Sequence, residues 1–461
     1  MTIRSIGVVG AGTMGAGIAQ VACLGGFDAA LHDPIPDALE RGTEQLRAAL
    51  GKGAERGRWS DAEAKAAEAR LRPSPSLEDL AACDLLIEAA PEDLELKRGL
   101  FARLAEVCGQ EAILATNTSS LSVTAIAAGV PEPGRVVGMH FFNPPALMKL
   151  VEVVAGEDSD EAALSATEEV ARGMGRTPVR AADQIGFVAN RCARPYSLEG
   201  LRLLGAGIAD HETIDRICRL GGGFRMGPFE LTDLVGIDVN LEVAKSFWEQ
   251  SFHEPRWQPH PIQAKMVAAG RLGRKAGRGY YDYSGGEHRP ADPDPPAKRA
   301  AEKVPRLVDL TAGSLSTLAS GEDAVGFVAL PDLESTALVE LTRADSTTDV
   351  TAAAAEAHFH GLGKHVEWVG DAPGLVLGRI VCQLVNEAHF ALGAKVATTE
   401  DIDTAMRLGF NYPRGPFEWS EAIGADRVLA ILDALHRELG EERYRAAPEL
   451  RRAAASPQLR Q

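Results

Sequence analysis

The feature that most constrains this chain is a glycine-rich loop near its start. A run of apolar, β-branched residues leads directly into the sequence VVGAGTMGAGIAQ, in which Gly10, Gly12 and Gly15 are spaced as G-x-G-x-x-G. A helix is predicted over about 13–24, and a second strand over 28–32. The spacing alone is a weak signal, but a strand before it and a helix after it predict a βαβ unit that binds a dinucleotide.

Each glycine of the loop has its own physical role. Gly10 permits the tight turn, Gly12 lets the backbone approach a pyrophosphate, and Gly15 lets helix and strand pack closely. Unpaired N–H groups at the helix start then bind the phosphate charge. The predicted cofactor-binding loop therefore comprises Gly10, Ala11, Gly12, Thr13, Met14 and Gly15.

Asp33 at the end of the second strand selects the dinucleotide. A carboxylate there accepts hydrogen bonds from a ribose 2′-hydroxyl and repels a 2′-phosphate, so the sequence predicts NAD rather than NADP. Asp33 could also act as the N-cap of a helix that starts at Pro34, because Asp before Pro suits that position. The two roles are compatible.

The rest of the first third continues the alternation of strands and helices. Short apolar runs predict buried parallel strands over 84–88, 112–115 and 136–141, and residues 34–71 read as a polar helical excursion. From residue 186 the alternation ends and helices follow. The predicted fold class is an α/β Rossmann-type NAD-binding domain followed by two all-α helical domains. The helices of the first all-α domain are predicted over 188–204, 210–220 and 229–250.

An internal repeat accounts for the second helical domain. Residues 138–238 lie over 326–426 without a gap when shifted by 188 positions. Over 183–238, 21 of 56 positions are identical, which is far above chance for a single register. A Pro-, Gly- and charge-rich stretch separates the copies and is predicted to be a linker. The predicted domains are 1–184 (NAD-binding), 185–284 (helical), 285–305 (linker) and 306–461 (a degenerate second helical copy).

Composition excludes several classes of protein. The net charge of −17 and the lack of a long basic stripe argue against nucleic-acid binding. No apolar run is long enough to span a membrane, and the start of the chain reads as a strand rather than a signal peptide. The six cysteines show no metal-type spacing and suggest a reducing compartment, so we expect a cytoplasmic protein with no metal site.

Further motifs follow the glycine loop in a specific order. They are PEDLELK at 91–97, N-T-S-S-L at 117–121, G-M-H-F-F-N-P and K-L-V-E-V within 138–153, G-F-V-A-N-R at 186–191 and G-P-F-E at 227–230. In this order and spacing they resemble the L-3-hydroxyacyl-CoA dehydrogenase family over roughly residues 3–283. The fused second copy resembles the bacterial 3-hydroxybutyryl-CoA and 3-hydroxyadipyl-CoA type with a duplicated C-terminal domain.

The resemblance implies roles for individual residues. His140 matches the catalytic histidine and Glu152 its partner, and Ser119 and Asn190 match the residues that contact substrate near the reacting centre. The family's coenzyme A contacts, a Ser and a Lys, fall on Ala49 and Arg56, so only Arg56 is a candidate for that role. Besides the loop and Asp33, the positions that match NAD contacts are Glu92, Lys97, Asn143 and Lys275.

These residue types suit the chemistry that the resemblance implies, the NAD-dependent oxidation of (S)-3-hydroxyacyl-CoA in fatty-acid or aromatic degradation. Histidine takes up and releases a proton near neutral pH, and a carboxylate on its other ring nitrogen fixes the tautomer. Simpler readings of the same residues are a core histidine, an outward-facing Glu152, helix caps at Ser119 and Asn190, and a solvated Arg56.

The second copy is expected to be catalytically silent. Glu152 falls on Glu340, but His140 falls on Val328, Asn190 on Gly378 and Asn143 on Pro331, and no glycine loop precedes this copy. One NAD per chain is therefore expected, and motifs present in both copies, such as G-P-F-E, are read as structural. The resemblance implies that the helical domain forms the dimer interface in single-copy relatives, so we expect a monomer with an internal pseudo-dimer or a homodimer.

Two other functions compete with the leading one. A related NAD-dependent sugar-acid dehydrogenase would share the glycine loop and the His–Glu pair, and the missing coenzyme A serine leaves room for it. A non-catalytic NAD-binding protein would need no intact His140, Glu152, Ser119 and Asn190. The sequence leaves open the acyl chain length and whether the acyl group carries a terminal carboxylate.

Overall fold

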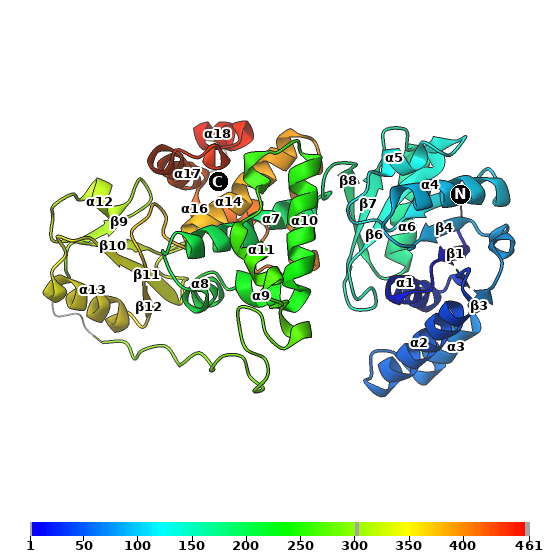
Figure 1. Ribbon diagram of the computed structural model, residues 1–461, viewed down its shortest axis with the longest axis horizontal. Helices are drawn as coiled ribbons and strands as arrows, with labels where there is room; N and C mark the ends of the chain where they lie inside the picture. The colour runs from blue at the N-terminus through cyan, green and yellow to red at the C-terminus, as the bar shows by residue number, and fades with distance from the viewer. Residues whose placement is uncertain (1, 300–303, 457–461) are drawn as a thin grey trace. The chain divides into compact units, whose positions relative to one another are not determined.

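The computed structural model describes residues 2–299 and 304–456 (Figure 1). By contacts the chain divides into two compact units, Met1–Ala189 with Lys395–Gly409 and Asn190–Ala394 with Phe410–Gln461. Residues 300–303 of the predicted linker and 457–461 of the predicted second copy lie outside the described residues. No helix in the described part of the chain is long and apolar enough to cross a membrane.

Unit 1 is built on an eight-stranded sheet with the order β3-β2-β1-β4-β5-β6-β7-β8. Neighbouring strands are parallel except β6 and β7, which run antiparallel. The first six strands have the order typical of a dinucleotide-binding sheet, as the sequence predicts. The strands are β1 (Ser5–Val9), β2 (Asp28–His32), β3 (Leu71–Ser74), β4 (Leu85–Glu88), β5 (Ile113–Thr116), β6 (Val136–Phe141), β7 (Leu150–Ala155) and β8 (Thr177–Ala182).

The strands at the centre of this sheet are short apolar runs that are buried throughout, which is why their sequences predict them well. β3 is different: its sequence LRPS is polar, contains proline and lies at the sheet edge, where two of its residues are exposed. The helices of this unit that precede residue 189 are α1 (Thr13–Leu24), α2 (Pro36–Glu55), α3 (Asp61–Ala69), α4 (Leu94–Val107), α5 (Val123–Ala127) and α6 (Glu161–Gly173).

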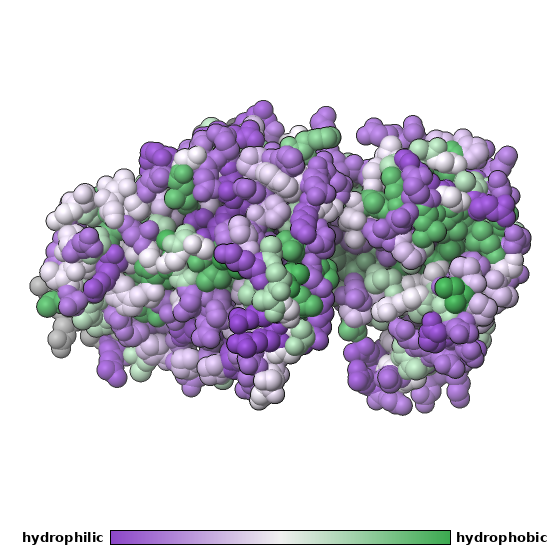
Figure 2. Space-filling view, viewed as in Figure 1, coloured by the Kyte–Doolittle hydropathy of each residue, from purple (hydrophilic) through white to green (hydrophobic). Residues whose placement is uncertain are grey.

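The polar excursion predicted over 34–71 consists of two helices, α2 and α3. The chain turns between them at Gly57, which has a φ of +66°, and α3 starts at a capping box formed by Ser60 and Glu63. Trp59 fills the gap between the helices, and its indole N–H donates to the carbonyl oxygen of Leu50 at 2.8 Å. The surface of this helical pair is mostly hydrophilic on the face shown in Figure 2, in agreement with its sequence.

Unit 2 contains the helices of both copies. The stretch 229–250, predicted as one helix, is two helices because Gly236 between them has a φ of +109°. The helices of the first copy are α7 (Ala189–Gly205), α8 (His211–Arg216) continued by the π-helical turn η3 (Ile217–Gly221), α9 (Pro228–Val235), α10 (Ile237–Gln250) and α11 (Pro261–Ala268). Those of the second copy in this unit are α12 (Leu315–Leu318), α13 (Asp349–Gly361), α14 (Leu377–Gly393), α16 (Pro416–Ile423), α17 (Ala425–Leu439) and α18 (Pro448–Ala455).

The second copy also contains a four-stranded sheet, which the sequence analysis did not assign. Its order is β12-β11-β10-β9, and β10 and β11 are antiparallel (Figure 1). The run β10–β11–α13–β12 repeats β6–β7–α6–β8 at a shift of 188 residues, so the duplication includes the last strands of the Rossmann-type domain as well as the helical domain. The strands are β9 (Leu307–Asp309), β10 (Val325–Val328), β11 (Leu338–Arg343) and β12 (His365–Trp368).

Each copy contributes a helix that packs on the sheet of the other copy. In unit 1, α15 (Thr399–Gly409) of the second copy packs against β7 and β8, and the Ala182 N–H donates to the Val396 oxygen at 2.8 Å. In unit 2, η3 of the first copy packs against β11, and the Gly370 N–H donates to the Ile208 oxygen at 2.7 Å. Both residues of the second bond are related to those of the first by the 188-residue shift. This exchange explains why the compact units do not follow the predicted domain boundaries.

The long helices α7 and α14 show the same reciprocity in two buried ion pairs. Arg191 Nε lies 2.8 Å from a carboxylate oxygen of Glu387, and Arg379 Nε lies 2.9 Å from Glu199. Positions 191 and 379 are equivalent in the repeat, as are 199 and 387. In an isologous interface, residue i of one copy contacts residue j of the other, and residue j of the first copy contacts residue i of the second. The two helices therefore pack about a local pseudo-twofold axis.

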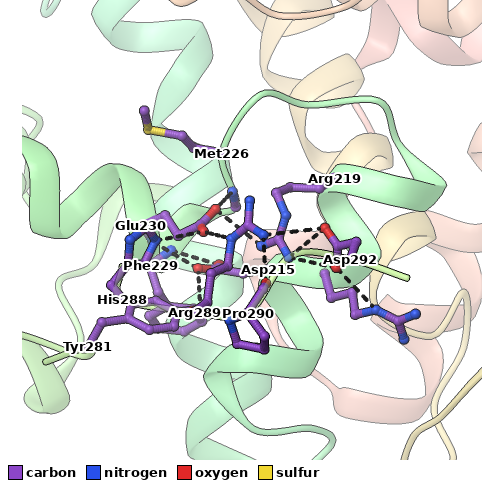
Figure 3. Close-up of polar contacts among 12 residues, drawn as sticks. Asp215, Arg219, Met226, Phe229, Glu230, Tyr281, His288, Arg289, Pro290 and Asp292 are labelled. Carbon is purple, nitrogen blue, oxygen red and sulfur yellow. Dashed lines mark hydrogen bonds and ion pairs between the residues drawn. The ribbon is translucent and has the colours of Figure 1, made fainter. Parts of the chain in front are cut away.

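The start of the predicted linker is held against unit 2 by an ion network. Figure 3 shows it converging on Glu230, which lies 3.0 Å from His288 Nε2 and 2.5 Å from Arg289 Nε. Arg219 lies 3.2 Å from Glu230 and 3.3 Å from Asp292. Its composition predicts a separating linker, but its charged residues fix its first part to the helical region.

The reciprocal ion pairs generate a stability prediction. Glu387 is 2% exposed and forms ion pairs with both Arg191 and Arg256, so Glu387→Gln removes a buried negative charge that lies beside two buried guanidinium groups. We expect a loss of about 3 kcal/mol in the free energy of unfolding, measured by chemical denaturation. The control is Glu106→Gln, which removes an exposed pair with Arg103 and should cost less than about 1 kcal/mol. Equal losses in the two variants would contradict the prediction.

Candidate active site

The glycine loop has the geometry that its sequence predicts. Gly10 has a φ of +102°, and a Cβ atom there would lie 2.6 Å from the Ala89 oxygen. A Cβ at Gly15 would lie 1.7 Å from the Gly10 oxygen, so only glycine permits this approach of helix to turn. A Cβ at Gly12 would meet nothing within 4 Å, and no side chain caps the start of α1. The loop therefore leaves open space beside helix N–H groups, which fits a pyrophosphate.

Asp33 connects the end of β2 to this loop. One carboxylate oxygen accepts the Ala11 N–H at 2.9 Å, and the other accepts the Ile35 N–H at 3.0 Å. Because α2 begins at Pro36 with Ile35 as its N-cap, Asp33 is not the N-cap that the sequence allowed. The carboxylate lies beside the glycine loop, where a ribose would bind.

His140 and Glu152 lie directly opposite each other on the antiparallel strands β6 and β7. His140 Nδ1 lies 2.6 Å from Glu152 Oε2, and the two side chains are 7% and 0% exposed. The twelve-residue spacing is thus that of one hairpin. The phenyl rings of Phe142 and Phe187 flank the imidazole, with centroids 4.6 and 5.9 Å away. The contact with Glu152 leaves Nε2 as the ring nitrogen available to a substrate.

Glu152 has a second role that its sequence did not indicate. Its other oxygen, Oε1, accepts the N–H groups of Val188 and Ala189 at 3.0 and 2.8 Å, where α7 begins. The carboxylate thus joins His140 to the first N–H groups of that helix. Positive partial charge at a helix start stabilises a carboxylate, which keeps this acceptor ready for the imidazole.

The loop that carries Ser119 is held by Glu92. One oxygen of this carboxylate accepts from the Thr118 hydroxyl at 2.6 Å, and from the N–H groups of Ser119 and Ser120 at 3.1 Å each. Partial burial opposes ionisation, but these hydrogen bonds and the Lys97 cation lower the pKa of Glu92. Ser119 itself is exposed and is not a helix cap, because α5 is capped by Ser122.

Lys97 lies inside the domain rather than at its surface. Its side chain is 1% exposed, and its ammonium lies 2.6 Å from Glu88, which is fully buried, and 3.4 Å from Glu92. Thr116 completes the cluster by donating its hydroxyl to Glu88 at 2.7 Å. In this arrangement Lys97 fixes the ends of β4 and β5 and the loop of Glu92.

Two residues near the site were not singled out from the sequence. Asn117 accepts the Phe141 N–H at 2.8 Å and so ties the serine loop to the end of the strand that carries His140. Gly17 faces Pro145, whose ring would lie 3.0 Å from an added Cβ, so α1 packs closely on the loop of Asn143. Asn143 is exposed on that loop. Neither Gly17 nor Asn117 belongs to a spacing pattern that a single sequence shows, so these contacts are visible only in the structure.

The remaining predicted residues lie elsewhere. Asn190 lies in the first turn of α7 and is partly exposed, and Lys275, in unit 2, is paired with Asp238 at 2.6 Å. Arg56 caps the C-terminal end of α2 and is exposed. Among the described residues there is no cluster of three or more potential metal ligands.

The second copy preserves the carboxylate without the histidine. Glu340 lies opposite Val328 in the β10–β11 register, as Glu152 lies opposite His140. It accepts the N–H groups of Val376 and Leu377 at 2.7 and 3.0 Å, the bonds that Glu152 makes at the start of α7. Joining the sheet to the helix is therefore the role that both copies share, and pairing with histidine belongs to the first copy alone.

The repeated G-P-F-E motif is likewise structural. Glu230 accepts the Gly227 N–H at 3.1 Å and Glu418 accepts the Gly415 N–H at 2.8 Å, and each motif starts a helix with proline in its first turn. The sequence-based reading of shared motifs as structural agrees with these bonds.

The second copy generates a prediction about pH. Burial raises the pKa of Glu340 to about 8, although the Val376 and Leu377 N–H groups oppose the shift. Because the folded pKa lies above the ordinary value of 4.5, the carboxyl stabilises the fold at low pH and loses this contribution as pH rises from 4.5 through 8. Relative to Glu340→Gln, the wild-type free energy of unfolding should fall over that interval, as measured by denaturation at several pH values. A constant difference would contradict the prediction.

Comparisons with known proteins identify the family of this chain. The model of the 3-hydroxyacyl-CoA dehydrogenase NAD-binding domain matches residues 5–184. The model of the 3-hydroxyacyl-CoA dehydrogenase C-terminal domain matches twice, at 186–283 and 374–461, which agrees with the repeat. The predicted fold class is confirmed.

Individual relatives extend the match to the whole chain. A 3-hydroxyadipyl-CoA dehydrogenase of Escherichia coli K12 is 40% identical over 98% of both chains. A crystal structure of an E. coli 3-hydroxybutyryl-CoA dehydrogenase has a TM-score of 0.94 at 39% identity, also over 98% of both chains. A 3-hydroxybutyryl-CoA dehydrogenase of Clostridioides difficile is 38% identical over 60% of this chain and 99% of its own length. With the glycine loop and the His140–Glu152 pair in place, this chain belongs to the NAD-dependent 3-hydroxyacyl-CoA dehydrogenase family.

Proposed function

We propose that the protein oxidises the 3-hydroxyl group of a short-chain or dicarboxylic (S)-3-hydroxyacyl-CoA, reversibly, to the 3-oxoacyl-CoA. The observation that carries the proposal is the buried His140–Glu152 pair in the same compact unit as an open glycine loop. When bound, NAD supplies the hydride acceptor at its nicotinamide. Gly10 to Gly15 and Asp33 hold it, with Glu92, Lys97, Asn143 and Lys275 as further proposed contacts.

His140 moves the proton in this proposal. In the oxidative direction Nε2 accepts the proton of the 3-hydroxyl group while Nδ1–H donates to Glu152. The buried carboxylate stabilises the imidazolium that forms and keeps the ring in one tautomer. In the reducing direction the same nitrogen returns the proton to the 3-oxo oxygen. A general base of this kind contributes roughly 10²–10⁴-fold to the rate.

Ser119 and Asn190 position the substrate. Each carries a group that hydrogen-bonds a carbonyl or hydroxyl oxygen, and such contacts hold the C3 carbon in a reactive orientation. The hydrogen bonds from the Glu92 carboxylate fix the backbone on either side of the Ser119 hydroxyl, which reduces the freedom of that group. Arg56 is the proposed contact for the coenzyme A moiety.

A sugar-acid dehydrogenase and a non-catalytic NAD-binding protein remain the alternatives. The full N-T-S-S loop, with its backbone held by Glu92, supports an acyl thioester substrate over a sugar acid. The buried pairing of His140 with Glu152 supports catalysis over binding alone. We also propose a cytoplasmic location, because all six cysteines are buried free thiols, which are typical of a reducing compartment.

The first test is the substitution of the base. His140→Ala should lower the rate of NADH oxidation with acetoacetyl-CoA by about 10²-fold or more, followed by absorbance, because the proton no longer has an acceptor or donor. His436→Ala, which removes a half-exposed histidine of α17, is the control and should retain wild-type activity. Unchanged turnover in His140→Ala would remove the base assignment. Absence of wild-type turnover on every 3-oxoacyl-CoA would remove the proposed function.

We also propose that the second copy acts as a built-in partner and that the full chain is a monomer. The reciprocal ion pairs between α7 and α14, and the exchanged helices η3 and α15, support this. A chain that contains both halves of an isologous interface has no need of a second chain to complete it.

Truncation tests this proposal. A fragment of residues 1–285 lacks α15, which packs against β7 and β8, and α14, which packs against α7. We expect this fragment to dimerise, with each copy supplying the missing helices to the other, while the full chain stays monomeric in light scattering. A fragment that remains a stable, active monomer would contradict the proposal.

A further inference from the structure

Arg194 is a buried cation in the helical region. It lies on α7, four residues after Asn190, and only 7% of it is exposed. Its Nε lies 3.4 Å from the backbone oxygen of Asn190, its guanidinium lies 5.6 Å from the ring centroid of Phe247, and its Nη1 has no hydrogen-bond partner. Burial lowers the pKa of Arg194 to about 10, so it remains charged at neutral pH.

No carboxylate among the described residues pairs with this guanidinium. The neighbouring arginines of the helical core behave differently: Arg191, Arg202 and Arg379 each lie within 3 Å of a buried glutamate. A buried charge without a counter-charge is unfavourable for folding, and an anionic ligand would supply the missing partner.

A second buried donor without an acceptor, the Tyr412 hydroxyl, interacts electrostatically with Arg194. Tyr412 is buried, its hydroxyl has no hydrogen-bond partner, and it interacts electrostatically with Arg194. A guanidinium N–H and a phenol O–H that both lack acceptors provide two donors for one carboxylate.

The internal repeat shows that the fold does not need either group. In the second copy the position of Arg194 is Cys382, which is fully buried, and in the first copy the position of Tyr412 is Phe224. Both equivalent positions thus carry buried side chains without a charge or a hydroxyl group. The guanidinium lies in the first copy, which also carries Asn190, and the tyrosine hydroxyl comes from the second copy.

Resting on the proposed function, we propose that Arg194 and Tyr412 bind the terminal carboxylate of a dicarboxylic 3-hydroxyacyl-CoA. Asn190 and Arg194 occupy the same face of α7, about 6 Å apart along its axis. In a six-carbon dicarboxylic chain the terminal carboxyl carbon lies three bonds beyond C3. A substrate whose C3 oxygen is held by Asn190 therefore presents its carboxylate one helical turn away, at the unpaired guanidinium. The enzyme then prefers a dicarboxylic acyl group to a fatty acyl group of equal length.

The test compares two substrates of equal length, (S)-3-hydroxyadipyl-CoA and (S)-3-hydroxyhexanoyl-CoA, by NADH formation. In the wild type kcat/KM should be higher for the dicarboxylic substrate. Arg194→Met should lower that value by about 100-fold or more, because the substrate carboxylate is then buried without a cation, and should change the value for the hexanoyl substrate less than about threefold. Arg194→Lys keeps the charge and should retain part of the preference. Tyr412→Phe, the residue at the equivalent position, should lower the preference by a smaller factor.

Stability separates a ligand site from a packing role. Because Arg194→Met removes an unpaired buried charge, the ligand-free variant should have a Tm equal to or above that of the wild type; a clear decrease would show that the guanidinium stabilises the fold and would overturn the proposal.

Two kinetic outcomes would also overturn it. An unchanged substrate ratio in Arg194→Met and Tyr412→Phe would remove the carboxylate site. An equal loss on both substrates would instead place Arg194 near the coenzyme A phosphates, which the two substrates share. Wild-type turnover of neither substrate is a separate result, since it removes the proposed function itself.

Discussion

The candidate active site depends on one carboxylate with two sets of partners. Glu152 holds the imidazole of His140 through one oxygen and the first N–H groups of α7 through the other. The side chain is fully buried, so each partner compensates for part of the cost of removing a charge from water. A change in the position of the start of α7 therefore reaches His140 through a single side chain. The strand pair that carries His140 and the N–H groups of Val188 and Ala189 are in this way joined by one residue.

The duplicated copy separates these two roles of the glutamate. Glu340 keeps both bonds to a helix start but faces Val328 instead of histidine, and burial raises its pKa to about 8. Without a histidine to share its proton, the carboxyl is favoured in its neutral form in the apolar interior. Retention of the residue in a copy without a glycine loop shows that joining sheet to helix is sufficient reason for a glutamate there.

The sequence predicts those parts of the fold that depend on local pattern. The glycine loop, the buried strands of unit 1 and the His140–Glu152 pair follow from spacing, apolar runs and the family resemblance. β3 is missed because an edge strand with proline lacks an apolar pattern. The packing of α15 on β7 and β8 is missed because it depends on contacts between segments more than 200 residues apart. Asn117 and the second role of Glu152 are missed for a related reason, since a hydrogen bond to a distant backbone N–H leaves no periodic signal.

Comparison of equivalent positions distinguishes structural from functional residues without an alignment of relatives. Where the copies agree, as in the G-P-F-E motif and the arginine–glutamate pairs of α7 and α14, the shared residue caps a helix or joins the copies. Where they differ, the first copy carries a polar or ionisable side chain that the second copy lacks. The differences are His140 and Val328, Asn190 and Gly378, and Arg194 and Cys382. The first two differences fall at positions for which the family resemblance implies catalysis and substrate contact. Arg194 shares their pattern and stands on the helix face of Asn190, so a substrate contact explains it better than packing, which the cysteine of the other copy already satisfies.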